Sequence, residues 1–139
     1  MSVEVRAVDP AQTRPLRQAV LRPHESLEEL ATHEPPGVHA VGAFEGGEMI
    51  ACGFVCPDGG PGAWRVRGMA TDPAHRGRGV GGAILDALVD HARAQGATRV
   101  WCNARTPALS LYARAGFEPE SEEFEIPGIG PHFVMGRRV

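Results

Sequence analysis

A glycine-rich stretch at residues 76–82 constrains this chain more than any other feature. It reads Arg76-Gly77-Arg78-Gly79-Val80-Gly81-Gly82, between a stretch expected as a strand and a helical pattern. The first N–H groups of a helix lack partners within it and carry the positive end of its dipole. Glycines let a phosphate approach that backbone closely. The stretch therefore predicts a pyrophosphate site at a helix start, rather than a turn that only joins two elements.

Hydrophobic periodicity on either side of this stretch predicts an α/β fold. Helices are expected over residues 9–21, 27–30, 84–92 and 106–115. Strands are expected over residues 3–8, 38–44, 49–55, 64–71 and 98–103, with a final pair formed by 117–124 and 133–139. This order favours one mixed sheet. Since 139 residues suit one core and no linker interrupts them, we predict a single domain over residues 1–139.

Composition argues against several classes of protein. A net charge of −3 at pH 7 leaves no basic excess for binding nucleic acid. No apolar run approaches the roughly 20 residues that span a bilayer, and no signal peptide is visible, so we expect a cytoplasmic protein that binds no membrane. The three cysteines are expected as buried apolar residues, and the histidines lack ligand spacing, so we expect no metal site.

Two other phosphate-binding motifs fit the glycines less well. Gly77, Gly79 and Gly82 satisfy the dinucleotide pattern G-x-G-x-x-G. That pattern should directly follow a first strand and be followed by an acid after the next strand, but here the next strand ends at Asn103. A lysine P-loop is excluded because the chain has no lysine. A dinucleotide-binding protein is therefore disfavoured.

Two motifs together resemble the GNAT superfamily of N-acetyltransferases. Its motif [Q/R]-x-x-G-x-[G/A] is matched by Arg76, Gly79 and Gly81. Its second signature, A-x-x-[LF]-Y-x-x-x-G-F, is matched by residues 108–117. The resemblance covers residues 64–117 and implies a mostly antiparallel sheet of six to seven strands with about four helices. Its strands 64–71 and 98–103 should splay apart.

The C-terminal region is similar to the ElaA/YjcF-like branch of that superfamily. The matching pieces are Asn103-Ala104-Arg105, Glu122-Glu123-Phe124, residues 128–132 and Met135. The branch carries a Gly-Ile-Pro-His motif before this methionine. The present chain reads Gly128-Ile129-Gly130-Pro131-His132, so Gly130 is an additional residue within the motif. This resemblance does not specify an acceptor.

The resemblance implies an N-acetyltransferase that moves an acetyl group from acetyl-CoA to a primary amine by direct attack. Tyr112 would then be the general acid that protonates the leaving thiolate, with a core tyrosine as the structural alternative. Cofactor contacts are expected from Met69, Ala70, Thr71, Arg76, Gly77, Arg78, Gly79, Val80, Gly81, Gly82 and Asn103. The alternative is a non-catalytic acyl-CoA-binding or regulatory domain of the same fold.

The acceptor side rests on fewer residues. By the period of two in a strand, Arg65, Arg67, Met69 and Thr71 are expected on one face. Arg67 and Arg105 are candidates to bind an acidic acceptor or to fix Glu123. His132 and Glu123 are candidate general bases, although a single histidine is more often structural. The acceptor is expected to be a small-molecule or peptide amine, and both a monomer and a homodimer remain open.

Overall fold

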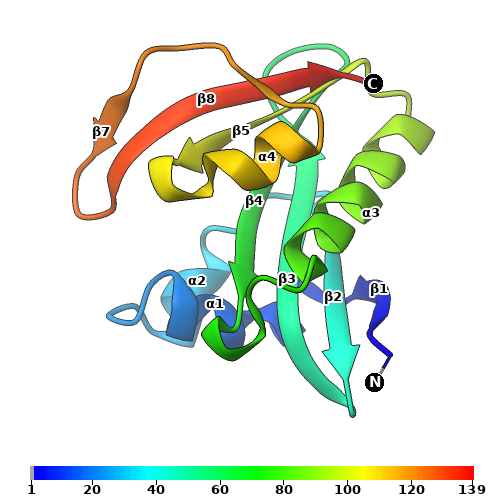
Figure 1. Ribbon diagram of the computed structural model, residues 1–139, viewed down its shortest axis with the longest axis vertical. Helices are drawn as coiled ribbons and strands as arrows, with labels where there is room; N and C mark the ends of the chain where they lie inside the picture. The colour runs from blue at the N-terminus through cyan, green and yellow to red at the C-terminus, as the bar shows by residue number, and fades with distance from the viewer. Residues whose placement is uncertain (1) are drawn as a thin grey trace.

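The computed structural model describes residues 2–139, which form one eight-stranded sheet with four α-helices (Figure 1). The strand order is β1-β2-β3-β4-β5-β8-β6, and β7 pairs with β8. Every pairing is antiparallel except that of β4 with β5. The mixed α/β fold is confirmed. The strand number exceeds the six or seven expected because the C-terminal segment contributes two very short strands.

The N-terminal third begins with β1 (Glu4–Val8) and turns at a capping box. Asp9 accepts from the N–H of Ala11, and Gln12 accepts from the N–H of Asp9, both at 2.9 Å. This cap starts a 3₁₀ turn (Pro10–Thr13) that leads into α1 (Arg14–Val20). A second capping box at Ser26 starts α2 (Leu27–Ala31).

The next segment is a hairpin of β2 (His39–Glu45) and β3 (Glu48–Pro57), followed by β4 (Ala63–Thr71). A 3₁₀ turn (Pro73–His75) leads from β4 to α3 (Val80–Ala94), which packs on β2, β3 and β4. Ile84, Leu85 and Leu88 of α3 are fully buried in that contact. On the opposite face, the Arg17 guanidinium of α1 lies 4.8 Å from the centre of the Phe54 ring. The sheet is therefore covered on both faces.

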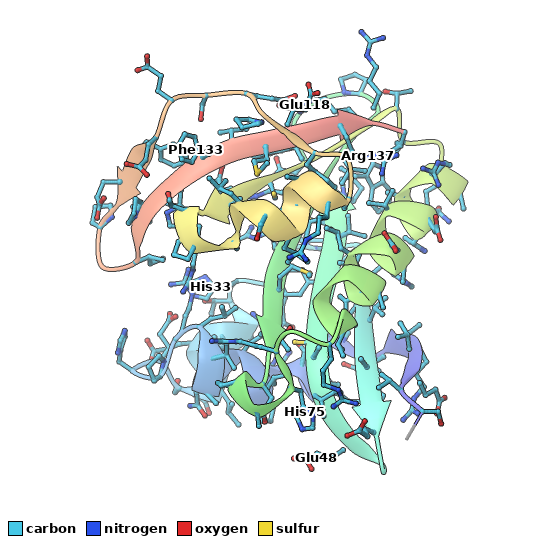
Figure 2. All side chains as sticks on the ribbon, viewed as in Figure 1. His33, Glu48, His75, Glu118, Phe133 and Arg137 are labelled. Atoms are coloured by element: carbon cyan, nitrogen blue, oxygen red, sulfur yellow. The ribbon has the colours of Figure 1, made fainter. Side chains whose placement is uncertain are left out.

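The C-terminal half adds β5 (Arg99–Arg105), a 3₁₀ turn (Thr106–Ala108), α4 (Leu109–Arg114), β6 (Glu118–Pro119), β7 (Phe124–Ile126) and β8 (Gly130–Arg138). Arg137 of β8 donates to the carbonyl of Ala115 at 2.7 Å, which ties β8 to the end of α4 (Figure 2). The continuous strand expected at 117–124 is wrong. The strand stops at Pro119 and resumes at Phe124. Between them the hydroxyl oxygen of Ser121, in place of a backbone carbonyl, accepts a hydrogen bond from the N–H of Val134 at 2.9 Å.

β4 and β5 part from each other after three paired residues. Ala63, Trp64 and Arg65 pair with residues 99–101, and the two strands diverge beyond them. β4 stays on β3, while β5 stays on β8. The divergence confirms the expected splay. It leaves the second half of β4 with an open edge toward β5.

A β-bulge at Gly68 changes the phase of β4. Cys52 pairs with Ala70, but Phe54 pairs with Arg67, so β4 has one more residue than β3 in this interval. Gly68 has φ +64°, which an L-residue rarely adopts. Arg65 and Arg67 consequently face the α1 side with Phe54, whereas Met69 faces α3, where its sulfur would lie 2.5 Å from a Cβ on Gly53. The expectation that all four side chains share one face is wrong: Met69 and Thr71 face α3, and the extra residue places Arg65 and Arg67 on the other face.

Candidate active site

A cleft extends from the open edge of β4 to the first turn of α3. Its wall includes these expected cofactor contacts: Met69, Ala70, Thr71, Arg76, Gly77, Gly79, Val80, Gly81 and Gly82. α4 supplies the opposite wall with Leu111, Arg114 and Ala115. The cleft encloses about 770 Å³, within the range of pockets that hold an extended small ligand.

The first turn of α3 has free donors. Gly79 is the N-cap in a left-handed conformation (φ +78°), and no side chain caps the helix. The hydrogen bond from the N–H of Ala83 to the carbonyl of Gly79 is the first in the helix, so the N–H groups of residues 80–82 precede the ladder. A Cβ on Gly82 would meet nothing within 4 Å. The turn therefore offers unobstructed donors and the positive end of a 15-residue helix to an anion.

The two arginines of the glycine-rich stretch point to different places. Arg76 lines the cleft. Arg78 instead forms an ion pair with Glu45 at the end of β2 and contacts Nδ1 of His75 at 2.7 Å. Arg78 is absent from the lining of the cleft, and its expected contact with the cofactor stays a prediction. The sequence does not predict this ion pair, because Glu45 comes close to Arg78 only once β2 has taken its place in the sheet.

Backbone N–H groups of β4 point into the gap left by β5. The N–H of Asp72 donates to the carbonyl of Ile50 at 2.8 Å, so it points toward β3. Alternation along the strand directs the N–H of Ala70 toward β3 as well, and those of Thr71 and Met69 away from it. Because β5 pairs only with residues 63–65, the gap beside Met69 and Thr71 has no neighbouring strand. Of the two donors expected for a thioester carbonyl, this geometry favours Met69 over Ala70.

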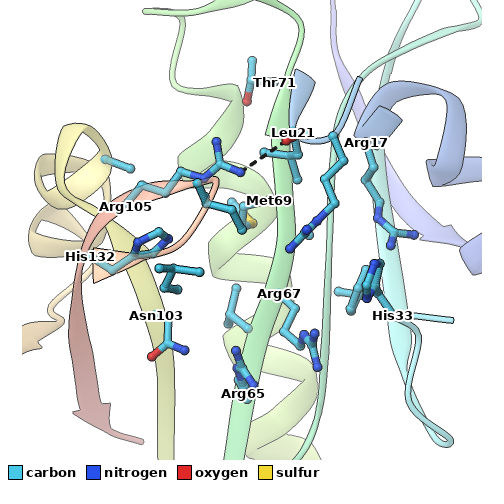
Figure 3. Close-up of a pocket in the computed structure, with 18 of the residues that line it drawn as sticks. Arg17, Leu21, His33, Arg65, Arg67, Met69, Thr71, Asn103, Arg105 and His132 are labelled. Carbon is cyan, nitrogen blue, oxygen red and sulfur yellow. Dashed lines mark hydrogen bonds between the residues drawn. The ribbon is translucent and has the colours of Figure 1, made fainter. Parts of the chain in front are cut away.

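A second cavity of about 230 Å³ opens on the other side of residues 69–71 (Figure 3). It lies between α1, α2, β4, β5 and the turn from β7 to β8. Leu21, Met69, Ala70, Arg105 and Leu111 line both hollows, so the two meet at the open edge of β4. Sequence reasoning missed the contribution of α1, α2 and the residues that follow each helix, namely Arg17, Leu21, Arg22, Leu30 and His33. No motif distinguishes these residues from an ordinary amphipathic segment.

Comparison with known proteins identifies the family to which this fold and cleft belong. The profile of the Acetyltransferase (GNAT) family matches residues 6–117. The chain belongs to the GNAT acetyltransferase family. It is 34% identical to the uncharacterized N-acetyltransferase YitI of Bacillus subtilis (strain 168), over 96% of this chain and 94% of that protein. It is also 37% identical to the uncharacterized N-acetyltransferase YjcF of the same organism, over 55% of this chain and 59% of that protein.

Solved structures share the whole GNAT fold. Escherichia coli ElaA superposes with a TM-score of 0.81 over 98% of this chain and 99% of its own, at 17% identity. The ribosomal-protein-S18-alanine N-acetyltransferase from Escherichia coli superposes with a TM-score of 0.78 over 99% and 94%, also at 17% identity. At this identity the likeness establishes the fold. The family and the named relatives make this chain an acetyltransferase.

Tyr112 of this GNAT chain lines the second cavity, the acceptor-side cavity, which the candidate acceptor-binding residues Arg67 and Arg105 also line. Its side chain is buried, and its ring packs edge-on against Phe117 with 5.6 Å between centroids. Burial raises the pKa of the phenol far above its usual value, and the neighbouring Cys102 thiol raises it further. The phenol therefore keeps its proton at neutral pH, as a proton donor must.

The two candidate bases are placed differently. His132 of β8 lines the acceptor-side cavity and is buried, and its Nδ1 lies 2.7 Å from the carbonyl of Gly130. A carbonyl only accepts, so Nδ1 donates this hydrogen bond, which leaves Nε2 as the ring nitrogen available to a substrate proton. Glu123 is exposed, accepts from Thr106 at 2.9 Å and lines neither hollow. The structure therefore favours His132 over Glu123.

The remaining expected side chains gather on the acceptor side (Figure 3). Asn103 lines that cavity rather than the cleft, and its expected contact with the cofactor stays a prediction. Arg67 lines only the acceptor-side cavity, whereas Arg105 lines both hollows. Arg105 reaches the carbonyl of Leu21 at 3.5 Å, so it does not fix Glu123 as one alternative proposed.

Proposed function

We propose that this chain transfers an acetyl group from acetyl-CoA to a primary amine by direct attack. One observation carries the proposal: a cleft that ends at uncapped helix donors meets a second cavity at the open edge of β4. An extended phosphate-bearing thioester fits the first hollow, and an amine fits the second. Both would reach residues 69–71 from opposite sides.

Residues of the cleft fit the groups of acetyl-CoA. The N–H groups of residues 80–82 suit the pyrophosphate, and Arg76 adds a positive charge beside them. The N–H of Thr71 suits an amide of the pantetheine arm. The N–H of Met69 suits the thioester carbonyl, where it would stabilise negative charge as that charge develops.

Acetyl-CoA supplies a carbonyl carbon that the neutral amine nitrogen attacks, and a thiolate that leaves. The new C–N bond replaces the C–S bond, giving an acetamide and free CoA. The nitrogen loses one proton and the thiolate gains one. In this proposal Nε2 of His132 accepts the first proton and the phenol of Tyr112 donates the second. Before the next turnover the histidine releases its proton to solvent and the tyrosine regains one from it.

A binding protein without turnover is the second candidate. The burial of Tyr112 against Cys102 favours it, because a phenol with a strongly raised pKa is a poor acid. Whether the phenol of Tyr112 reaches the leaving thiolate decides between the two candidates.

We further propose the cytoplasm as the compartment, since Cys52, Cys56 and Cys102 are all free thiols.

Two measurements test the proposal together. Thermal shifts with acetyl-CoA, CoA and NAD report which cofactor binds, and release of free thiol across a panel of amines reports turnover. We expect stabilisation by acetyl-CoA and CoA but not by NAD, together with amine-dependent thiol release. Stabilisation without thiol release for any amine would support the non-catalytic candidate. Stabilisation by NAD alone would refute both.

A further inference from the structure

The acceptor-side cavity is lined by arginines and by no carboxylate. Its guanidiniums come from α1, the loop after α1, β4 and β5: Arg17, Arg22, Arg65, Arg67 and Arg105. Among the residues that the structure describes, no Asp or Glu lines it, although the chain has more acidic than basic residues overall. A cavity of this composition in a chain of net charge −3 is a local concentration of positive charge.

Neighbouring carboxylates offset only part of this charge. Arg17 pairs with Glu34 at 2.7 Å, and Glu34 is already shared with Arg14 at 2.8 Å. Arg22 lies 3.4 Å from Glu25, which also contacts His33 at 2.8 Å. Arg65 lies 3.5 Å from Asp58. Within residues 2–139, Arg67 and Arg105 form no ion pair.

The two unpaired guanidiniums are held in an unfavourable setting. Burial lowers the pKa of Arg67, and the charge of Arg65 lowers it further. Burial lowers the pKa of Arg105 as well, with an added effect of Arg22. Arginine nevertheless stays charged in proteins, so the repulsion persists. The buried Nε of Arg65 also has no hydrogen-bond partner among the described residues. An anion in the cavity would relieve each of these costs.

We propose that the acceptor is a small primary amine carrying an anionic group, a carboxylate or a phosphate, which Arg67 binds in the cavity with help from Arg105. This inference rests on the proposed function, because it assigns the amine to this cavity. The cavity of about 230 Å³ suits a small molecule. Arg67 lies two residues before Met69 on β4, with the bulge at Gly68 between them. Amines with one to three carbons between nitrogen and anion therefore form the series that measures the spacing of the two sites.

Binding tests this inference without turnover. Protein saturated with CoA is titrated calorimetrically with matched pairs: glycine, β-alanine and 4-aminobutanoate against their amides, and 2-aminoethyl phosphate against ethanolamine. We expect the anionic member of at least one pair to bind about 10- to 100-fold more tightly, as for a charged hydrogen bond. The carboxylate and phosphate pairs distinguish the two sources of the anion.

Variants assign the preference to Arg67. Arg67→Gln should reduce it about tenfold or more, and Arg67→Lys should retain part of it because the charge remains. The control Arg93→Gln removes the same charge from an exposed ion pair with Asp90 on α3, and should keep the full preference. Arg67→Lys also covers the case in which Arg67→Gln does not fold.

Turnover separates failure of this inference from failure of the proposed function. Equal binding of both members of every pair by the parent, or a preference that survives Arg67→Gln, overturns the anionic acceptor even if amines are acetylated. Anionic amines that bind through Arg67 but never release thiol leave the recognition intact and refute the acetyl transfer. The supporting result is a ratio of kcat/KM, anionic over neutral, that falls about tenfold in Arg67→Gln.

Discussion

Tyr112 lies with its phenol beside the thiol of Cys102, which connects α4 to the middle of β5. Burial raises the pKa of Cys102 to about 12, so this thiol stays neutral at pH 7. The pKa of Tyr112 is raised as well, first by burial and then by Cys102. Two neutral groups therefore meet beside the acceptor-side cavity, and each of them holds its proton at pH 7.

Replacing Tyr112 tests whether its proton is used. Tyr112→Phe keeps the ring against Phe117 and removes the proton, so we expect turnover to fall by about 100- to 10,000-fold. Affinity for acetyl-CoA should change little. Cys102→Ala is the matched control, because it removes the neighbour of the phenol but leaves the phenol itself. Unchanged turnover in Tyr112→Phe would make Tyr112 a packing residue and water the acid.

Replacing His132 tests whether this side chain takes the proton of the acceptor amine. His132→Gln removes the lone pair of Nε2, so we expect a lower rate at neutral pH that recovers at higher pH, where more of the acceptor is already neutral. The thermal shift with acetyl-CoA should be retained. Glu123→Gln should resemble the parent, because Glu123 lines neither hollow. Superimposable pH–rate profiles for all three proteins would contradict the assignment of His132.

The first turn of α3 can be tested with two substitutions at one position. Gly82→Ala should preserve the thermal shift with acetyl-CoA and stabilise the helix by about 0.5–1 kcal/mol. Gly82→Asp should also fold, since a negative charge near the start of a helix is favourable. The new carboxylate would, however, repel the pyrophosphate and compete with it for the same N–H groups. We expect the thermal shift to disappear in Gly82→Asp alone. A shift that survives there would place the phosphates elsewhere.

Gly68 should matter for both stability and the site. A Cβ on Gly68 would lie 2.4 Å from the Phe54 ring, and its φ of +64° strains any other residue. We expect Gly68→Ala to lower the free energy of unfolding by more than about 2 kcal/mol in urea titrations, and to lower kcat/KM by moving Arg67 relative to Met69. Gly37→Ala is the control. Gly37 has φ +77° with open space around it. The free energy of unfolding lost in Gly37→Ala, about 1–2 kcal/mol, therefore measures backbone strain alone. Equal losses at both positions would contradict the clash.

Stability should decrease in acid through a pair of stacked histidines. His39 of β2 and His91 of α3 stack with centroids 3.6 Å apart, and burial together with His91 lowers the pKa of His39. The unfolded chain then binds this proton more readily, so the stabilisation is complete above about pH 6.5 and is lost as the pH falls below it. Urea titrations at about pH 8 and about pH 5.5 measure the loss. His39→Gln should show a smaller loss, and an identical one would contradict this account.

Some of this protein follows from its sequence alone. The turn at residues 76–82 and the signature at residues 108–117 are contiguous, so backbone chemistry within each segment is enough to predict a helix start and a short helix. The capping boxes at Asp9 and Ser26 act over three residues. The alternating strands predict the mixed sheet, and the two motifs in order predict the family that the profile match established.

Only the tertiary structure decided which side chains meet. Arg78 pairs with Glu45 because β2 ends beside the turn before α3, and Glu123 bonds to Thr106 outside both hollows. The bulge at Gly68 turns Arg67 toward α1 and Met69 toward α3, which a strict period of two does not allow. α1 and α2 complete the cationic cavity without any motif. Contacts between distant segments depend on strand register and on one inserted residue, and neither leaves a local pattern that sequence reasoning can detect.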